Sequence, residues 1–153
     1  MPHPADVTPP KNDADYFGRM HKSIFSAGLN WGVVEKKWPN FEKPFAGFSP
    51  IKVAGFTEAD VKRLMNDDGL IRNEKKIRAV IYNAKEFVQV KEQFGSFKKY
   101  LNSFGKDEAR LQTDLQARFH HLGPSSSRTF LWSVAYPLKP TPEERKWMAG
   151  HRS

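Results

Sequence analysis

Apolar residues recur at intervals of three and four along most of this chain, the spacing that places side chains on one face of an α-helix. The longest stripe of this kind consists of Ile77, Val80, Ile81, Ala84, Phe87, Val88 and Phe94. Asn73 precedes the stripe as a helix cap, and Gly95 follows it as a stop. The pattern therefore predicts a buried central helix of about five turns.

Shorter stripes predict further helices on both sides of the central one. A first helix should begin near Asp13, bury Phe17, Met20 and Ile24, and end at Gly28. The other expected helices occupy residues 33–38, 40–45, 49–52, 57–69, 96–104, 106–121, 124–134 and 141–150. No stretch alternates with a period of two for long enough to form a strand, so the sequence predicts an all-α fold.

The length of 153 residues is that of one domain with a single core. The first dozen residues contain four prolines and almost no apolar side chains, so residues 1–12 are expected to be a flexible tail. Residues 13–150 then form one helical domain. Within it, residues 106–136 are expected to form two helices joined by a tight hairpin.

Charge and composition narrow the partners without identifying one. The 25 Lys and Arg against 17 Asp and Glu give a formal charge of +8, which favours nucleic acid or an anionic membrane surface. The absence of Cys excludes disulfides, thiolate metal ligands and cysteine nucleophiles. No apolar run approaches the ~18 residues that span a bilayer. We therefore expect a soluble, cytoplasmic protein that does not enter membranes.

The predicted hairpin has the layout of a helix-hairpin-helix phosphate clamp. Leu122 and Gly123 end one helix, and the free N–H groups at the start of the next helix face outward with its positive dipole end. Ser125, Ser126 and Arg128 would add donors to a phosphate. The alternative is an ordinary corner between two helices, in which glycine ends one and serine caps the other.

The turn after the first helix contains a second candidate site. Gly28, Leu29 and Asn30 lead directly into Trp31. A leucine on such a turn can wedge into a base stack, and a tryptophan can stack on an extruded base. The alternative is that both apolar side chains anchor the core, as most leucines and tryptophans do.

Several segments resemble the 3-methyladenine DNA glycosylase I family, in the same order and without long gaps. Residues 26–31 resemble its Gln-Ala-Gly-Leu-Ser-Trp segment, and residues 67–77 resemble Asp-x-Gly-Ile-Ile-Arg-Asn-Arg-x-Lys-Ile. Residues 79–84 resemble Ala-Val-Ile-x-Asn-Ala, and residues 94–97 resemble Phe-Gly-Ser-Phe. Together the matches extend from about Asp15 to Val134, which is most of the chain.

The resemblance implies a DNA glycosylase of base excision repair. Such an enzyme flips an alkylated, cationic base similar to 3-methyladenine out of duplex DNA and hydrolyses its N-glycosidic bond. Trp31 matches the base-stacking residue, and Gly28 and Leu29 match the turn that enters the DNA. Residues 122–124 match the hairpin. No cofactor is implied, and we expect a monomer that acts on double-stranded DNA, associated with the nucleoid while it does so.

The sequence also departs from the family. The Cys and His ligands of the family's zinc site are missing, so no metal is expected. The family's base-contacting Glu is replaced by Ser23, and Tyr16, Phe25, Asn30 and Trp38 are candidates to complete the pocket in its place. The histidines are expected at the surface or near phosphates; they are His3, His21, His120, His121 and His151.

These departures bear on catalysis. The wider superfamily uses an Asp beyond the hairpin to stabilise the oxocarbenium ion, but no Asp follows Gly123 here. Glu143 and Glu144 fit a helix-capping role better. A cationic leaving base, whose bond is already weak, requires no strong base. Two alternatives stay open: a catalytically weak or inactive relative that binds or senses distorted DNA, and a helical interaction module.

Overall fold

The computed structural model describes residues 8–150, apart from the side chain of Met148. This part of the chain is helical and contains no strand, which confirms the predicted all-α fold. The principal elements are α1 (Asp13–Ser26), α2 (Trp31–Lys37), η2 (Trp38–Asn40), η3 (Ala46–Phe48), α3 (Pro50–Ala54), α4 (Glu58–Met65), α5 (Glu74–Phe94), α6 (Phe97–Asn102), α7 (Glu108–Arg118), α8 (Pro124–Ser133) and α9 (Pro142–Gly150).

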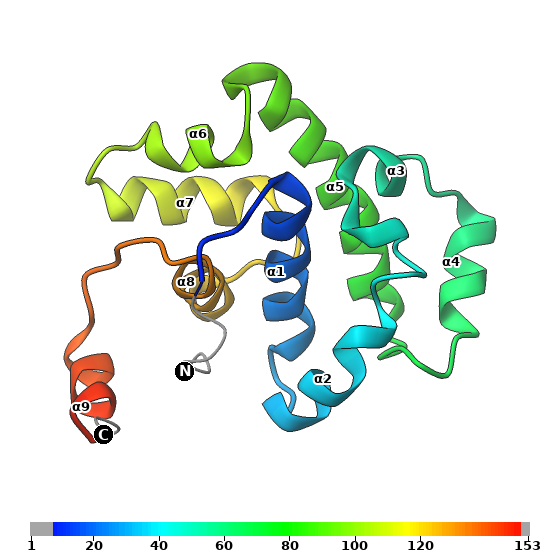
Figure 1. The fold of residues 1–153 in the computed structure, drawn as a ribbon, viewed down its shortest axis with the longest axis horizontal. Coiled ribbons are helices and arrows are strands. Elements are labelled where there is room, and N and C mark those ends of the chain that lie inside the picture. Colours follow the sequence, from blue (N-terminus) through cyan, green and yellow to red (C-terminus); the bar gives the residue numbers. More distant parts are fainter. Residues whose placement is uncertain (1–7, 151–153) are drawn as a thin grey trace.

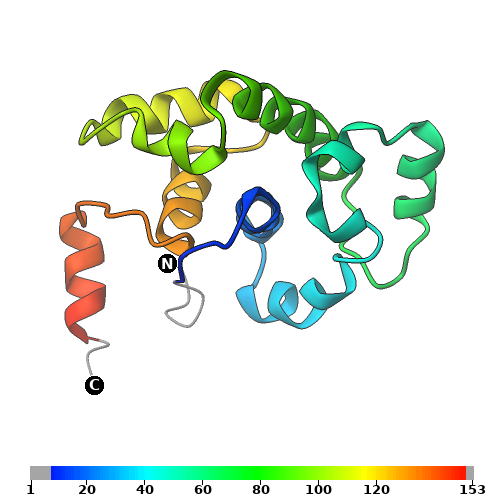
Figure 2. The same cartoon turned by 45° about the horizontal axis from the view of Figure 1, so that its top comes forward.

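Helix α5 is the central helix that the longest apolar stripe predicts. Its 21 residues begin after Asn73, whose side chain accepts the N–H of Lys76, and end at Gly95 with a φ of 93°. Helices α1, α3, α4 and α6 all pack against it. Helix α1 lies between α5 and α8 (Figure 1) and is seen almost end-on, surrounded by the other helices, in Figure 2.

Aromatic side chains fill the space where α1, α5, α6, α7 and α8 meet. Phe97 is fully buried at its centre. Its ring lies 4.3 Å from that of Phe87 and about 5 to 6 Å from four other rings. These four rings belong to Tyr16, Tyr100, Phe119 and Phe130. The cluster therefore joins the N-terminal helices to the hairpin.

Local capping explains where most helices begin. Asn12, Ser96 and Asp107 each accept the backbone N–H three residues further on, at 2.9 to 3.1 Å. Such a bond satisfies one of the N–H groups that an α-helix leaves unpaired at its start. Thr141 and Glu144 cap α9 reciprocally, which confirms the capping role expected of Glu144.

Two expected helices differ from the observed elements. In the segment 40–45, Asn40 belongs to η2 and residues 41–45 form consecutive turns rather than a helix, because Pro44 has no N–H to donate and the carbonyl of Glu42 instead accepts the N–H of Gly47. The helix expected to end at Gly69 ends earlier, at Met65, where the N–H of Asn66 closes the last turn on Lys62 and Arg63.

The expected flexible tail is described only in part. Residues 1–7 lie outside the described residues. Further on, the N–H of Thr8 lies 3.4 Å from the carbonyl of Ser133. Arg19 donates to the carbonyl of Thr8 and, at 2.8 Å, to the carbonyl of Ser133. Residues 8–12 are thus joined to the ends of α1 and α8.

We predict that Phe97→Ala destabilises the fold severely. The substitution removes a ring that touches five others, and large core deletions of this kind cost about 3 to 5 kcal/mol. Urea unfolding followed by circular dichroism measures the loss. Ile51→Ala is the control because Ile51 is 66% exposed; equal unfolding midpoints for the two variants would contradict the central position of Phe97.

Candidate functional site

A cleft of about 630 Å³ opens beside α1. Helix α1 forms one wall, and α2 and the segment from η2 to η3 form the other. The lining residues are Thr8, Asn12, Ala14, Asp15, Gly18, Arg19, Lys22, Ser23, Trp31, Trp38, Pro39, Glu42, Gly47, Phe48 and Ser133. The structure therefore brings together three of the residues expected from the sequence, namely Ser23, Trp31 and Trp38.

Trp31 is the first residue of α2 and lies half-buried in the cleft wall. Its position follows from the cap before it, because the Asn30 side chain accepts the N–H of Gly32 at 2.7 Å. The Nζ of Lys22 lies 5.9 Å from the centre of the indole ring. A cation thus lies over one face of the indole, and the ring borders the open cleft.

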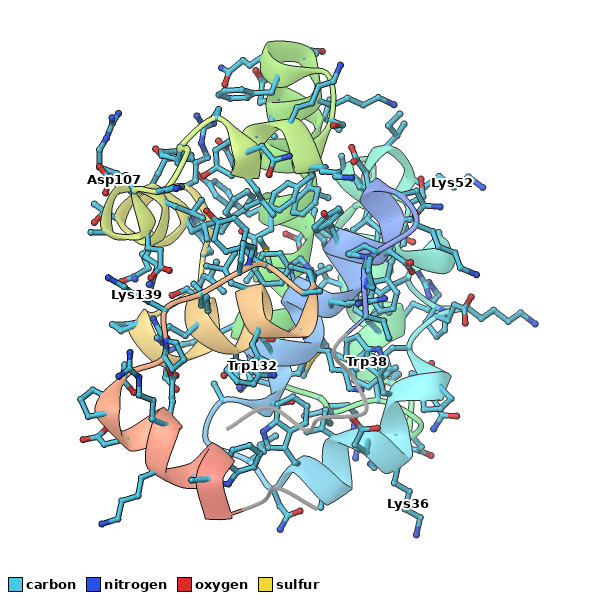
Figure 3. The ribbon with its side chains drawn as sticks, turned by 60° about the vertical axis from the view of Figure 1, so that its left-hand side comes forward. Lys36, Trp38, Lys52, Asp107, Trp132 and Lys139 are labelled. Atoms are coloured by element: carbon cyan, nitrogen blue, oxygen red, sulfur yellow. The ribbon has the colours of Figure 1, made fainter. Side chains whose placement is uncertain are left out.

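A second aromatic surface faces the cleft from η2 and η3. The Trp38 ring stacks on Phe41 at 4.6 Å and on Phe48 at 5.2 Å, with interplanar angles of 25° and 11°. Figure 3 shows Trp38 beside α1. Gly18 allows this packing, because a Cβ there would lie 3.2 Å from the Phe48 ring. Flat aromatic walls of this kind suit a planar ligand.

The backbone that presents Phe48 is strained. Ala46, Gly47 and Phe48 have φ values of 53°, 68° and 57°, all in the left-handed region. For the two residues other than glycine this conformation costs about 1 to 2 kcal/mol each. Such strain persists only where the surroundings impose it, and it concentrates at functional sites.

The turn between α1 and α2 exposes apolar side chains. Gly28 has a φ of 79°, which allows the tight reversal, and Leu29 and Val33 are 45% and 50% exposed. Lys76 secures the base of the turn by donating to the carbonyls of Phe25 and Ala27, at 3.4 and 3.0 Å. The Leu29 side chain therefore projects from a fixed turn into solvent.

Two expected pocket residues lie in the core instead. Tyr16 is 7% exposed and packs on Phe97, and Phe25 is fully buried with its ring 5.1 Å from Phe41. Neither lines the cleft. Asn30 is exposed, and its side-chain oxygen is occupied in capping α2.

Charged residues of the cleft were missed by the sequence interpretation. Arg19 is bound to the Thr8 and Ser133 carbonyls, and Lys22 pairs with Glu35 at 2.5 Å. Glu42 also lines the cleft, and its carboxylate has no partner among residues 8–150. The spacing of Arg19 and Lys22 from Ser23 on one face of α1 was a usable signal. For Glu42 the sequence contained none.

Residues 119–123 join α7 to α8, in the region where the sequence analysis places the hairpin. Leu122 is buried, and Gly123 donates its N–H to the Ser126 side chain at 2.9 Å. Ser127 closes the first turn of α8 on the Gly123 carbonyl. The backbone N–H groups of Ser125 and Ser126 donate to no described residue. These two donors lie at the N-terminus of α8, which is the positive end of the helix dipole.

Arg128 contributes to a different contact from the one expected. Its guanidinium donates to both oxygens of Glu144, at 3.0 and 2.5 Å, and to the Lys139 carbonyl at 3.1 Å. The pair fastens α9 to α8, and the guanidinium lowers the pKa of the Glu144 carboxyl. With Arg128 occupied in this way, a phosphate at the hairpin would meet the backbone donors of residues 125 and 126.

The expectation for His21 is wrong. His21 is fully buried, whereas His120 and His121 are exposed as predicted, and His3 and His151 lie outside the described residues. The Nδ1–H of His21 donates to the Phe17 carbonyl at 2.8 Å, and Nε2 lies 3.1 Å from the Asn83 amide nitrogen. Burial, opposed by the bond to Phe17, lowers the pKa of His21 to about 4.

Between residues 8 and 150, no three His, Asp or Glu side chains lie close enough to hold a metal ion. None of the helices in that range is long and apolar enough to cross a membrane.

Known proteins share this sequence pattern and this fold. The family model described as methyladenine glycosylase matches residues 7–130. DNA-3-methyladenine glycosylase 1 of Escherichia coli (strain K12) is 42% identical over 78 residues, which are 51% of this chain and 42% of that protein. The DNA-3-methyladenine glycosylase of Haemophilus influenzae (strain ATCC 51907 / DSM 11121 / KW20 / Rd) is 35% identical over 78 residues, with the same two coverages.

A solved structure extends the likeness to almost the whole fold. The 3-methyladenine DNA glycosylase I from Staphylococcus aureus superposes with a TM-score of 0.77 at 27% identity, covering 90% of this chain and 86% of that one. The sequence matches are shorter, and the chain spans about two fifths of the length of the curated relatives it matches.

We predict that the stability of the fold falls as the pH drops from about 6.5 to about 4. The unfolded chain takes up a proton on His21 near pH ~6.5, and the folded chain does so only near a pKa of about 4. The free energy contributed by neutral His21 is therefore fully present above pH ~6.5 and declines below it, by up to about 3 kcal/mol.

Urea unfolding at several pH values from about 4 to about 7 measures this effect. His21→Gln has no titrating group at this position and should lack that part of the pH dependence. Parallel curves for the variant and the wild-type chain would contradict the assignment.

Proposed function

The chain belongs to the methyladenine glycosylase family, and on that premise we propose that it is a DNA glycosylase of base excision repair. It extrudes an alkylated base from duplex DNA into the cleft beside α1 and hydrolyses the N-glycosidic bond. The observation on which this rests is the juxtaposition of the aromatic cleft and the exposed Leu29 turn at the α1–α2 junction. The curated relatives and the S. aureus enzyme are named for 3-methyladenine.

The binding step uses elements on two parts of the fold. Leu29 enters the base stack and occupies the space that the extruded nucleotide leaves. The free N–H groups of Ser125 and Ser126 hold a backbone phosphate. The net charge of +8 adds a sequence-independent attraction to DNA.

The chemical step follows from the state of the base. Trp31 stacks on the extruded base, with Trp38 and Phe48 as the facing aromatic surface. N3-alkylated adenine in DNA is a cation that departs as a neutral molecule, so its bond to the sugar is already weakened. A water positioned in the cleft then completes the hydrolysis without a strong base.

The charges of the cleft support a cationic substrate. Arg19 and Lys22 both have anionic or carbonyl partners, whereas Glu42 has none among residues 8–150. An unpaired carboxylate attracts a cation, and aromatic faces do so as well. Glu42 thus stands in for the carboxylate that Ser23 replaces on α1.

We predict that Trp31→Ala lowers the release of 3-methyladenine from alkylated duplex DNA by about 10- to 100-fold, because base stacking on an aromatic ring contributes about 1 to 3 kcal/mol. Binding of undamaged duplex should change little. Mass spectrometry of the freed base measures release. Phe104→Ala is the control, since Phe104 lies outside the cleft. Release by Trp31→Ala at the wild-type rate would contradict the assignment, and binding without release by the wild-type chain would instead indicate a sensor of distorted DNA.

We predict further that Glu42→Gln lowers kcat/KM for a cationic base several-fold, because the substitution removes a charge and keeps the shape. The matched control is Glu143→Gln, since Glu143 is an exposed carboxylate on α9 that does not line the cleft. The difference in kcat/KM between Glu42→Gln and Glu143→Gln should become smaller as salt is added. Equal rates for both at low salt would exclude Glu42 from recognition.

A further inference from the structure

Asn83 holds the loop that leads from α7 into α8. It is fully buried in the middle of α5. Its Oδ1 accepts the backbone N–H of His120 at 2.8 Å, and its Nδ2 donates to the carbonyl of the same residue at 3.2 Å. The side-chain amide therefore pairs with both polar groups of one backbone residue, much as a neighbouring strand would.

The orientation of this amide is determined by His21. The second N–H of Asn83 Nδ2 points to His21 Nε2 at 3.1 Å. His21 Nδ1 must be the protonated nitrogen, because it lies 2.8 Å from the Phe17 carbonyl, which can only accept. A reversed amide would set Oδ1 against the lone pair of Nε2 and the NH₂ group against the His120 N–H. Only one orientation satisfies every polar group.

Tyr82, the residue before Asn83, contacts the loop between α7 and α8 from the solvent side. The Tyr82 ring stacks on the His120 ring at 3.5 Å between centres and 6° between planes. Beyond this point the chain must turn sharply, and His121 has a φ of 61°. Leu122 and Gly123 then lead into α8. Three residues thus separate the backbone held by Asn83 from the first turn of α8.

We propose that Asn83 is a positioning residue for the hairpin: it fixes the His120 backbone and so aims the free N–H groups at the start of α8. This inference rests on the proposed function, in which those groups bind a DNA phosphate. Asn83 is buried and touches no DNA itself. Its contribution is to prevent the loop from losing conformational entropy at the moment of binding.

The test compares Asn83→Leu, which keeps the approximate volume and removes the amide, with Val90→Ala. Val90 is buried in the same helix two turns further on, so its truncation destabilises the core without contacting the loop. Binding to an alkylated duplex is measured over a range of salt concentrations, with both variants verified as folded. Asn83→Leu should weaken binding about tenfold and lower the salt slope by about one phosphate contact. Val90→Ala should change neither.

Amide hydrogen exchange at His120 provides a readout without DNA. Asn83→Leu should raise the exchange rate of the His120 amide about tenfold more than Val90→Ala does. If Asn83→Leu does not fold, Asn83→Asp replaces it, because aspartate keeps the acceptor for the His120 N–H and loses both donors. Equal binding, salt slope and exchange in an Asn83 variant and in Val90→Ala would overturn the positioning role alone. Failure of the wild-type chain to bind duplex or release a base would overturn the proposed function.

Discussion

The three hydrogen bonds of the Asn83 amide are the constraint on which the geometry of this protein depends. They join α1, through His21, to the loop before α8, although these segments are about a hundred residues apart in the chain. The cleft is built on α1, and the hairpin begins at that loop. A single buried amide therefore relates the position of the cleft beside α1 to that of the hairpin before α8.

The aromatic cluster around Phe97 stabilises the same junction without specifying its geometry. Apolar contacts are not directional, so Phe87, Phe119 and Phe130 could pack on Phe97 in more than one register. The polar bonds of Asn83 and His21 are satisfied in only one. The region before α1 and the end of α8 are joined similarly, by the two carbonyls that Arg19 binds. The polar contacts thus select the arrangement that the apolar ones stabilise.

Helix positions could be predicted from the sequence because the determining contacts are local. The caps at Asn73, Ser96 and Thr141 lie within three residues of the groups they bind, and that at Asn73 was expected. Side-chain partners were harder because they come from distant segments. The bond between His21 and Asn83 joins residues 62 apart. His21 lies four residues after Phe17 and three before Ile24, which indicates burial, but the identity of its partner does not follow from this local spacing.

The same distinction between local and distant contacts explains which positions in the candidate site could be predicted. The positions of Trp31 at the cleft and of Leu29 in solvent could be predicted because the residues that set them, Gly28 and Asn30, are their neighbours in the chain. Tyr16 and Phe25 have the same chemical character, but they lie on either side of the cleft-lining face of α1 and are buried, Tyr16 against Phe97 and Phe25 against Phe41.

The charge at the cleft follows from competition between partners and not from composition. More cationic than anionic side chains occur in the chain, and Arg19 and Lys22 both reach the cleft. Arg19 is bound to the Ser133 carbonyl and Lys22 to the Glu35 carboxylate. These contacts reduce the interaction of both cations with a ligand in the cleft. The carboxylate of Glu42 has no such partner among residues 8–150. A protein with a net positive charge can in this way still present a carboxylate inside its cleft.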